Sequence, residues 1–411
     1  MLLKRPEEYK MSNREIIYLA QKHLMRNVGR YDLAFTQGRG MKLWDADGRE
    51  YLDFLGGIAV CALGHAPEAV ARALSGQAER LIHVSNYFYN EPMVRLAGRL
   101  AESSGLERVF FCNSGAEANE AALKLARKYA FDRYGPGRNG FITALGSFHG
   151  RTFGTISATG QAKVKAGFEP LLPGFTHVPY GDFEALAGAV TPSTCAVMLE
   201  PIQGEGGVAT PPPDYLPRVA TLCEDRDIML ILDEVQTGLG RTGRPFAFQH
   251  YDFRPHILTL AKALGGGIPC GAMLAREEAA AHFTPGSHST TVGGAPLVMS
   301  AALVMVETIL RPGFLEEVER VGRYFKESLE RLAGELPSLV RDVRGQGLLL
   351  GLELAVPAGP LVEAMHKRGF IINAATPEVL RFVPPLIVTR AEIDLLLPAL
   401  KETLADAPPA R

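Results

Sequence analysis

The chain has 411 residues, of which 47% are hydrophobic and 21% are charged, as in ordinary globular proteins with room for two domains and a large core. Lysine and arginine number 43 against 45 acidic residues, a net charge of −2, so charge gives no reason to expect nucleic acid or an anionic membrane as a partner. No stretch approaches the roughly 20 apolar residues of a membrane span, and the first six residues lack an apolar signal core. We therefore expect a cytoplasmic protein.

The cysteines are scattered and lack the spacing of metal ligands: Cys61, Cys112, Cys195, Cys223 and Cys270. Their odd number argues against a disulfide framework. They are typical of small apolar core residues in a reducing compartment, and we expect no metal site.

The first part of the chain predicts a helix, a hairpin and a glycine-rich loop. Residues 16–27 carry an apolar helical stripe, and residues 42–54 alternate as a hairpin that turns at Asp47 and Gly48. Residues 56–65 form the glycine-rich loop. A second helix is expected over residues 66–81, with Pro67 in its first turn.

From Arg108 onward, apolar runs alternate with helical patterns. Runs that predict strands occupy residues 109–112, 141–145, 195–199, 229–232 and 257–260. Helices are predicted to begin at Ser114, where Glu117 completes a capping-box pattern, and over residues 214–225. This alternation predicts an α/β fold, with a mostly parallel sheet flanked by helices on both faces.

The last third of the chain predicts a smaller α+β domain. A long helix follows Gly294, residues 314–336 and 393–404 are helical, and residues 343–354 are strand-like. Residues 407–411 are expected to be frayed.

Three charged residues follow two successive predicted strands. Asp233 and Glu234 end the run 229–232, and Lys262 follows the run 257–260 at the start of a glycine-rich loop. Ligands bind at the carboxyl ends of strands in open parallel sheets. A lysine that forms a Schiff base and a carboxylate that keeps the pyridine nitrogen protonated are the charged groups that a pyridoxal 5′-phosphate site needs.

The glycines of GLGRTG (238–243) also fit the spacing of a dinucleotide-binding loop. That motif needs a helix opening at the glycines and an acidic residue at the end of the next strand. Pro245 follows almost at once, and residues 246–250 have no helical apolar stripe. The dinucleotide interpretation is therefore weak.

Three motifs in this order resemble the class III aminotransferases of pyridoxal-phosphate fold type I, most closely the acetylornithine and ornithine aminotransferases: EPIQGEGG (200–207), LILDEVQTG (230–238) and TLAKALGGG (259–267). The resemblance covers about residues 38–385. It implies an N-terminal segment (1–65) that packs with the small domain, a large cofactor-binding domain (66–300) and a C-terminal small domain (301–411). It also implies a homodimer with shared active sites.

By this resemblance, Lys262 and Asp233 are the catalytic residues, and the amino donor is N-acetylornithine or a related ω-amino acid in arginine biosynthesis, with 2-oxoglutarate as acceptor. The resemblance implies that Phe148 stacks on the cofactor, Val235 packs under its ring and Gln236 bonds its phenolic oxygen. The full set of implied cofactor contacts is Ser114, Gly115, Ala116, Phe148, Asp233, Glu234, Val235, Gln236, Lys262 and Thr291.

The resemblance also implies substrate contacts. Arg151 would bind a substrate carboxylate, and Glu200 would pair with Arg381 and swing aside as substrates alternate. Thr290 joins this set, while Thr291 would come from the neighbouring subunit to complete the phosphate site.

The chain departs from the family pattern away from Asp233 and Lys262, at Ala295, Cys61 and the shortened loop around His65. No role is predicted for His149, and an approach of Tyr31 to a substrate carboxylate stays open. Ornithine, succinylornithine, 4-aminobutyrate and carrier-linked lysine-pathway aminotransferases share the core motifs and stay open as alternatives. An aminomutase or decarboxylase on the same scaffold also stays open, whereas a DNA-binding regulator would need a helix-turn-helix module and a basic patch that this chain lacks.

Overall fold

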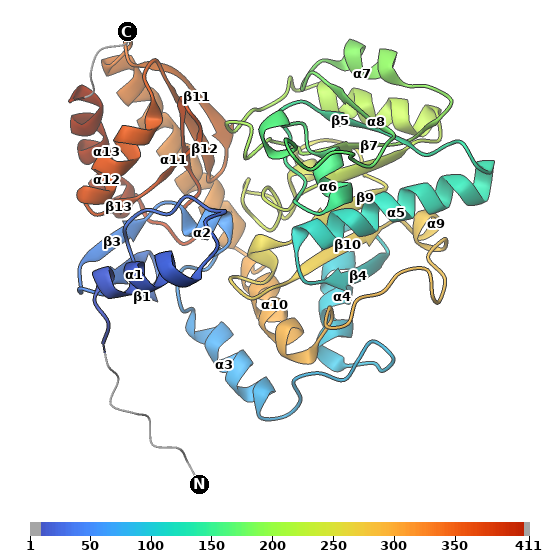
Figure 1. The fold of residues 1–411 in the computed structure, drawn as a ribbon, viewed down its shortest axis with the longest axis horizontal. Helices are drawn as coiled ribbons and strands as arrows, with labels where there is room; N and C mark the ends of the chain where they lie inside the picture. Colours follow the sequence, from blue (N-terminus) through green and yellow to red (C-terminus); the bar gives the residue numbers. More distant parts are fainter. Residues whose placement is uncertain (1–9, 407–411) are drawn as a thin grey trace.

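A computed structural model describes residues 10–406. The expectations for the first six residues and for residues 407–411 lie outside this range. Figure 1 shows a large domain built on one sheet and a small domain beside it, with the N-terminal segment lying against the small domain.

The large domain holds a seven-stranded sheet within the described residues. Its strands, in spatial order, are β4 (Arg108–Cys112), β10 (Gly271–Ala275), β9 (Ile257–Leu260), β8 (Met229–Asp233), β7 (Thr194–Leu199), β5 (Gly140–Ala144) and β6 (Phe175–Val178). Strand β10 pairs antiparallel with β4 and β9, and the other four neighbouring pairs are parallel, so the predicted mostly parallel sheet is confirmed. Strands β7, β8 and β9 are buried along their whole length, because helices cover both faces of a parallel sheet.

Strands β6 and β10 were not predicted from the sequence. Strand β6 is four residues long and only partly buried. Strand β10 has only two large apolar residues, Met273 and Leu274, between glycine and alanines, and it lies between β4 and β9. Neither gives a strong local signal.

Helices surround this sheet: α3 (Glu68–Ala78), α4 (Glu91–Ser104), α5 (Gly115–Tyr134), α6 (Phe153–Ala158), α7 (Phe183–Ala189), α8 (Tyr215–Asp225), α9 (Glu277–Ala280) and α10 (Pro296–Ile309). Helix α10 packs against α3 and α4. Short 3₁₀ turns connect the elements at η1 (Ala162–Val164), η2 (Ala247–His250) and η3 (Lys262–Leu264).

Helix α5 begins as half of the predicted capping box. The Ser114 hydroxyl accepts a hydrogen bond from the Glu117 N–H at 3.2 Å. The Glu117 carboxylate, however, accepts from the Asn113 N–H at 2.5 Å and not from the N-cap residue. The helix ends at Gly135, whose φ is +75°.

The N-terminal segment contains α1 (Asn13–His23), α2 (Gly56–Ala59) and a second sheet of β1 (Phe35–Arg39), β2 (Lys42–Asp45), β3 (Glu50–Asp53) and β13 (Phe370–Ile371). The predicted hairpin is confirmed, because β2 and β3 pair antiparallel and Gly48 turns with φ of +89°. Strand β13 belongs to the C-terminal part and pairs parallel with β3. The predicted domain boundaries stay a prediction.

The small domain is an antiparallel sheet of β11 (Val340–Gln346), β12 (Leu349–Leu354), β15 (Val379–Phe382) and β14 (Asn373–Thr376), with helices α11 (Phe314–Glu335), α12 (Ala358–Lys367) and α13 (Arg390–Ala405). The strand-like prediction for residues 343–354 is confirmed, and the segment is divided between two strands, β11 and β12. Gly347, with φ of +58°, turns the chain between β11 and β12, and a Cβ there would lie 2.6 Å from the Arg241 carbonyl oxygen.

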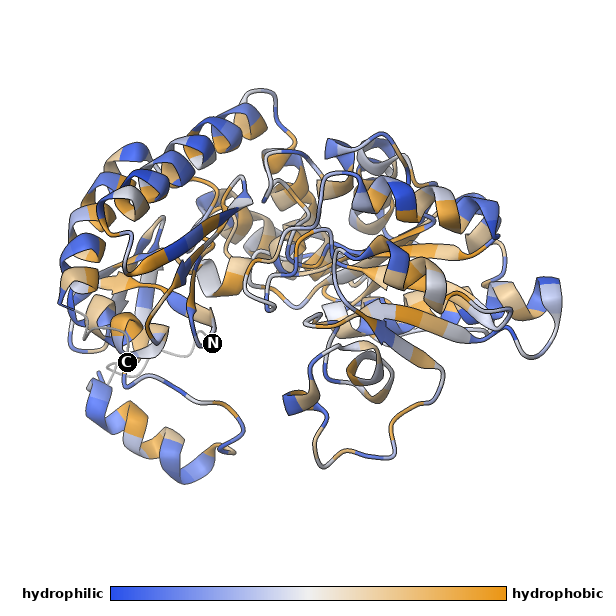
Figure 2. Ribbon diagram, turned by 90° about the horizontal axis from the view of Figure 1, so that it is seen from above, coloured by the Kyte–Doolittle hydropathy of each residue, from blue (hydrophilic) through white to orange (hydrophobic). Residues whose placement is uncertain are grey.

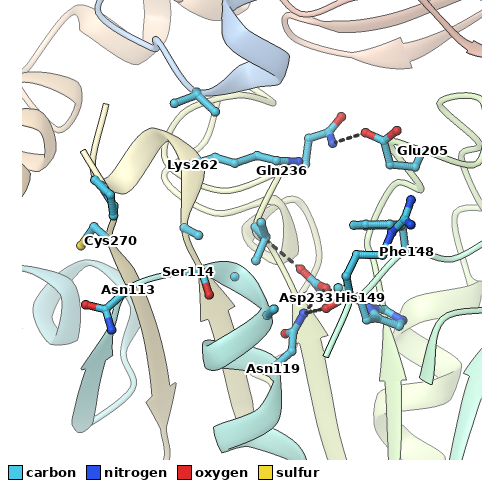
Figure 3. Close-up of a pocket in the computed structure, with 18 of the residues that line it drawn as sticks. Asn113, Ser114, Asn119, Phe148, His149, Glu205, Asp233, Gln236, Lys262 and Cys270 are labelled. Atoms are coloured by element: carbon cyan, nitrogen blue, oxygen red, sulfur yellow. Dashed lines mark hydrogen bonds and ion pairs between the residues drawn. The ribbon is translucent and has the colours of Figure 1, made fainter. Parts of the chain in front are cut away.

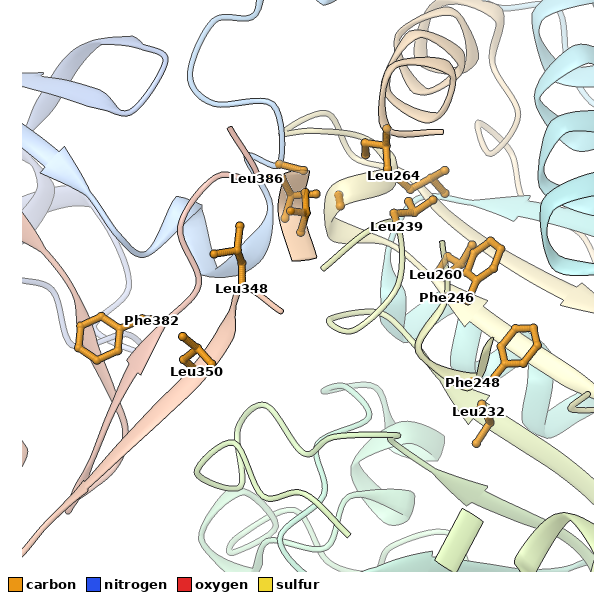
Figure 4. Close-up of a cluster of buried hydrophobic side chains, with 14 of the residues drawn as sticks. Leu232, Leu239, Phe246, Phe248, Leu260, Leu264, Leu348, Leu350, Phe382 and Leu386 are labelled. Atoms are coloured by element: carbon orange, nitrogen blue, oxygen red, sulfur yellow. The ribbon is translucent and has the colours of Figure 1, made fainter. Parts of the chain in front are cut away.

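One hydrophobic cluster extends through both domains, and Figure 4 shows part of it near the domain boundary. Figure 2 shows the apolar residues concentrated on the sheets and inner helix faces. Among the described residues, no single helix is long and apolar enough to cross a membrane; α10 and α11 meet the length and composition requirements only as a pair bent by 69°.

Candidate active site

A cavity of about 480 Å³ lies at the carboxyl ends of β8 and β9, beside the start of α5 (Figure 3). It brings together ten of the residues that the sequence predicted: Ser114, Gly115, Ala116, Phe148, Arg151, Glu200, Asp233, Val235, Gln236 and Lys262. These residues are far apart in the sequence, and the sheet edge collects them, as expected for an α/β fold.

Asp233 ends β8 and is buried. Its Oδ2 accepts from Asn119 Nδ2 at 2.7 Å and lies 2.8 Å from His149 Nδ1, while its Oδ1 accepts from the Val235 N–H at 3.0 Å. A carboxylate has about four acceptor positions. Three donors therefore leave one position, on Oδ1, for a group in the cavity, which fits a protonated pyridine nitrogen.

Lys262 follows β9 and has a φ of +44°, a conformation that costs a non-glycine residue of order 1–3 kcal/mol and is concentrated at functional sites. The side chain lines the cavity and keeps some exposure, yet protein surrounds it closely. Burial, together with the positive charge of Arg381, lowers the pKa of Lys262 to about 8 although nearby carboxylates oppose this shift. At neutral pH the unprotonated amine is therefore far more populated than in an ordinary lysine.

The start of α5 packs closely against Val235. A Cβ built on Gly115 would lie 2.9 Å from both Cγ atoms of Val235, so only glycine fits without a shift. A helix start leaves N–H groups without intrahelical partners, at the positive end of the helix dipole. This arrangement fits a phosphate group.

The aromatic and polar residues of the cavity lie on its other side. Phe148 is half-buried, and the Arg151 guanidinium lies over its ring at 5.5 Å. The Gln236 side chain contacts Glu205, with Nε2 to Oε1 at 3.4 Å, and accepts from Arg381 Nη1 at 3.2 Å.

The predicted pairing of Glu200 with Arg381 is wrong. Arg381 Nη1 pairs with Glu205 Oε1 at 2.5 Å and donates to the Gly204 carbonyl at 3.1 Å. Glu200 instead accepts from the Phe148 N–H at 3.0 Å, and burial, with Asp233 close by, raises its pKa well above the usual range. Burial alone would raise the pKa of Glu205 too, but Arg381 and Lys262 lower it.

The structure also contradicts the predicted cofactor contact of Glu234. Its carboxylate accepts from the N–H groups of Ala247 and Phe248, at 2.6 and 2.9 Å, and from the Thr237 hydroxyl at 3.2 Å. It therefore fixes η2 in place and does not line the cavity. Burial raises its pKa to about 7, although these donors oppose the shift.

The loop of residues 288–294, called the threonine loop because it carries Thr290 and Thr291, does not line the cavity in a single chain. The Thr290 hydroxyl accepts from Asn113 Nδ2 at 3.1 Å, and Asn113 does line the cavity. Thr291 is exposed.

Sequence reasoning gave no role to three residues that the structure places in or beside the site. Asn119 is a polar residue in the apolar stripe of α5, which is a signal that could have been noticed. His149 is buried next to the predicted Phe148. Glu205 is the second glutamate of the EPIQGEGG motif, and only the fold shows that it reaches Arg381.

The glycine-rich loop at 238–243 is not a dinucleotide site. No helix opens at its glycines in the structure. Arg241 is instead buried, and it donates to the carbonyl oxygens of Leu348 and Pro384, which joins the loop to the small domain.

Comparison with known proteins gives one consistent result. The family model for Aminotransferase class-III matches residues 24–404. An acetylornithine aminotransferase from Myxococcus xanthus is 50% identical over 92% of this chain and 95% of its own length. Ornithine aminotransferase from Toxoplasma gondii superposes with a TM-score of 0.92 at 33% identity, covering 96% of this chain and 95% of that one. N-acetylornithine aminotransferase from Stenotrophomonas maltophilia gives 0.81 at 38% identity, with 95% and 98% covered.

Proposed function

The chain belongs to the class III aminotransferases, which use pyridoxal phosphate, and we propose that it transfers the terminal amino group of N-acetylornithine to 2-oxoglutarate in arginine biosynthesis. The observation that carries this proposal is one cavity holding Lys262, Asp233 and the start of α5, with Arg381 alongside. The relatives named acetylornithine aminotransferase support the choice of donor.

We propose that the cofactor is held by the contacts predicted from the sequence, except for Glu234. The N–H groups at Ser114, Gly115 and Ala116 would bind its phosphate. Phe148 would stack on one face of the ring and Val235 would pack on the other, while Asp233 Oδ1 accepts from the ring nitrogen. Gln236 Nε2 can donate to the phenolic oxygen when its weak 3.4 Å contact with Glu205 is released.

When bound, pyridoxal phosphate supplies an aldehyde that captures amines and a ring that accepts electrons from the adjacent carbon. Lys262 Nζ would hold the group covalently until the amino donor displaces it, and the released amine would then serve as the base that removes the proton from the donor carbon. Its pKa of about 8 suits this task, because a base works best when its pKa is near the working pH. Asp233, held by three donors, keeps its negative charge in place as electrons move toward it.

Substrate carboxylates would meet two arginines. Arg381 is buried, and its Nη2 has no hydrogen-bond partner within residues 10–406. That free donor suits a substrate carboxylate in the fork geometry that arginine favours. We propose that Glu205, in place of Glu200, is the carboxylate that occupies Arg381 and moves aside for a dicarboxylate acceptor. Arg151 would bind the far end of the donor.

We further propose that the active enzyme is a homodimer. Tyr87 and Tyr89 are each 93% exposed, an unusual exposure for neighbouring aromatic rings on a free surface. The adjacent Asn86 Nδ2 donates to the carbonyl oxygens of Thr290 and Gly293, at 2.8 and 3.0 Å. The aromatic loop, residues 86–89, and the threonine loop therefore form one surface. A second copy of the chain would cover this surface, and Thr291 would reach the phosphate site of that second copy.

Screening amino donors with 2-oxoglutarate tests the reaction. N-acetylornithine should give the highest kcat/KM; a clear preference for ornithine, succinylornithine or 4-aminobutyrate would select that alternative instead. Borohydride should fix the cofactor to the peptide that contains Lys262, and label on another lysine would refute the assignment. Conversion without net amino transfer to 2-oxoglutarate would indicate an aminomutase or decarboxylase.

Mixed dimers test the shared site. Loss of a charge-assisted hydrogen bond costs about 1.5–3 kcal/mol, so Thr291→Ala should weaken cofactor retention by about 10- to 100-fold. When Thr291→Ala subunits are mixed with inactive Lys262→Ala subunits, one site of each mixed dimer receives both changes and the other receives neither. Activity should therefore partly return. Mixed dimers, verified by mass, that never exceed either parent in activity would contradict the model.

A further inference from the structure

Two side chains that the mechanism leaves unused face the same oxygen of Asp233. Asn119 comes from α5, and His149 comes from the segment between β5 and α6 (Figure 3). Asn119 Nδ2 lies 2.7 Å from Asp233 Oδ2, and His149 Nδ1 lies 2.8 Å from the same atom. All three side chains are buried.

The hydrogen bonds around Asn119 fix which end of its amide faces Asp233. The Thr259 hydroxyl donates to Asn119 Oδ1 at 2.6 Å, and Asn119 Nδ2 also donates to the His149 carbonyl at 2.8 Å. The amide nitrogen therefore uses both of its hydrogens, one of them on Asp233. Thr259 lies on β9, three residues before Lys262, so the network connects the two strands of the site.

The imidazole of His149 must also donate. An ionised carboxylate offers only acceptors, so Nδ1 carries a hydrogen at this contact. On the other side of the ring, Nε2 is buried and has no protein partner within residues 10–406. A hydrogen on Nε2 would thus be a buried donor without an acceptor, which is costly.

We propose that His149, assisted by Asn119, is a positioning residue that acts through Asp233 and donates a hydrogen bond as a neutral ring. Two donors on Oδ2 fill that oxygen, so the free acceptor position of Asp233 is on Oδ1. Because the ring is neutral, it orients the carboxylate without cancelling its negative charge. The inference rests on the proposed function, in which this charge faces the ring nitrogen of the cofactor.

A matched pair of variants tests the donor. In His149→Asn the amide nitrogen can occupy the place of Nδ1, whereas in His149→Gln it lies one carbon further, near the place of Nε2. His149→Gln should lose about 10- to 100-fold in kcat, with little change in KM, and should release pyridoxal phosphate faster. His149→Asn should recover most of both losses. The absorbance spectrum of the loaded enzyme and its pH titration should shift in His149→Gln and stay near the parent in His149→Asn.

Three results would overturn the proposal. Parental kcat and cofactor release in both variants would mean that the Nδ1 hydrogen bond has no functional effect. Equal losses in both variants, with parental melting temperatures for the cofactor-free proteins, would mean that donation from the Nδ1 position is not what matters. The side-chain nitrogen resonances of ¹⁵N-histidine-labelled parent protein report which ring nitrogens carry hydrogen, and the His149 signals are the ones missing in His149→Asn. Hydrogen on both nitrogens of His149 would contradict the neutral ring.

The nitrogen measurement reads the parent protein and needs a variant only to assign the His149 signal, for which either His149→Asn or His149→Gln serves. It also separates this proposal from the proposed function. If borohydride labelling finds no cofactor at Lys262, the proposed function fails, whereas the tautomer of His149 is read independently of cofactor chemistry.

Discussion

Replacing Gly115 by alanine should weaken cofactor binding without unfolding the protein. A Cβ at this position would lie 2.9 Å from both Cγ atoms of Val235 and 3.5 Å from the Ala261 Cβ. Real Cβ atoms essentially never approach heavy atoms below 3.0 Å, so either Val235 or the start of α5 must move. Val235 is β-branched and rotates poorly, and its N–H donates to Asp233 Oδ1 at 3.0 Å. The added methyl therefore acts on the phosphate end and the carboxylate end of the site together.

The expected size follows from two opposing effects. Overpacking by one methyl group typically costs about 1–3 kcal/mol, which is about a 5- to 150-fold loss of cofactor affinity. Gly115 has no left-handed φ, and alanine favours helices by at most about 1 kcal/mol over glycine. In the cofactor-free protein Val235 and the start of α5 can move apart and relieve the added methyl, so the melting temperature should change little, whereas cofactor binding needs them in their parental places and incurs the overpacking cost.

Equilibrium dialysis with absorbance detection measures the affinity for pyridoxal phosphate. Gly334→Ala is the matched control, because Gly334 is exposed on α11, has no atom within 4 Å of an added Cβ and lies in the small domain. It should leave cofactor affinity at the parental value. Parental affinity in Gly115→Ala as well would refute the view that close contact between α5 and Val235 shapes the site.

Three further predictions concern charge. Glu205→Gln removes the carboxylate from Arg381, so KM for 2-oxoglutarate should fall and discrimination between donor and acceptor should weaken; unchanged half-reaction constants would contradict this role. Reloading of cofactor-free enzyme needs the unprotonated Lys262 amine, so its rate should rise with pH through about 8, and a midpoint at the ordinary lysine value of 10.5 would contradict the lowered pKa. Burial would lower the pKa of His65, but hydrogen bonds with Asp53 and Cys61 raise it from 6.5 to about 9. The stabilisation by this pair is then complete below pH 6.5 and is lost as pH rises through about 9, so the gap in melting temperature between the parent and His65→Gln should shrink over that range; a constant gap would argue against the pairing.

The strands that form the site could be predicted because they are buried on both faces. Continuous apolar runs such as residues 229–232 give a strong signal, and the structure places β8 where the sequence does. Charged residues just after such runs lie at the sheet edge wherever the strands are parallel. For that reason the sequence alone was enough to place Asp233 and Lys262 at the site, whereas the partly buried β6 could not be found.

The wrong partner for Arg381 shows what the sequence does not contain. Glu200 and Glu205 follow the same strand, five residues apart, and both line the cavity. Which one reaches Arg381 depends on how the small domain sits over the loop that starts at Gly204, and no local pattern encodes that contact. Glu234 was assigned to the cofactor for a similar reason, because its neighbour Asp233 faces the cavity while its own side chain points into the core.

The cofactor end of the site does not depend on how the small domain sits over the loop at Gly204. Gly115 and Asn119 lie four residues apart on α5, which is roughly 6 Å along the axis of a helix. One helical turn thus sets the spacing between the expected phosphate position and the amide that holds Asp233. Helix α5 and strands β8 and β9 all belong to the large domain, whereas Arg381 comes from β15 of the small domain. A shift of the small domain therefore alters the contact of Arg381 with Glu205 and leaves the hydrogen bonds of Asp233 in place.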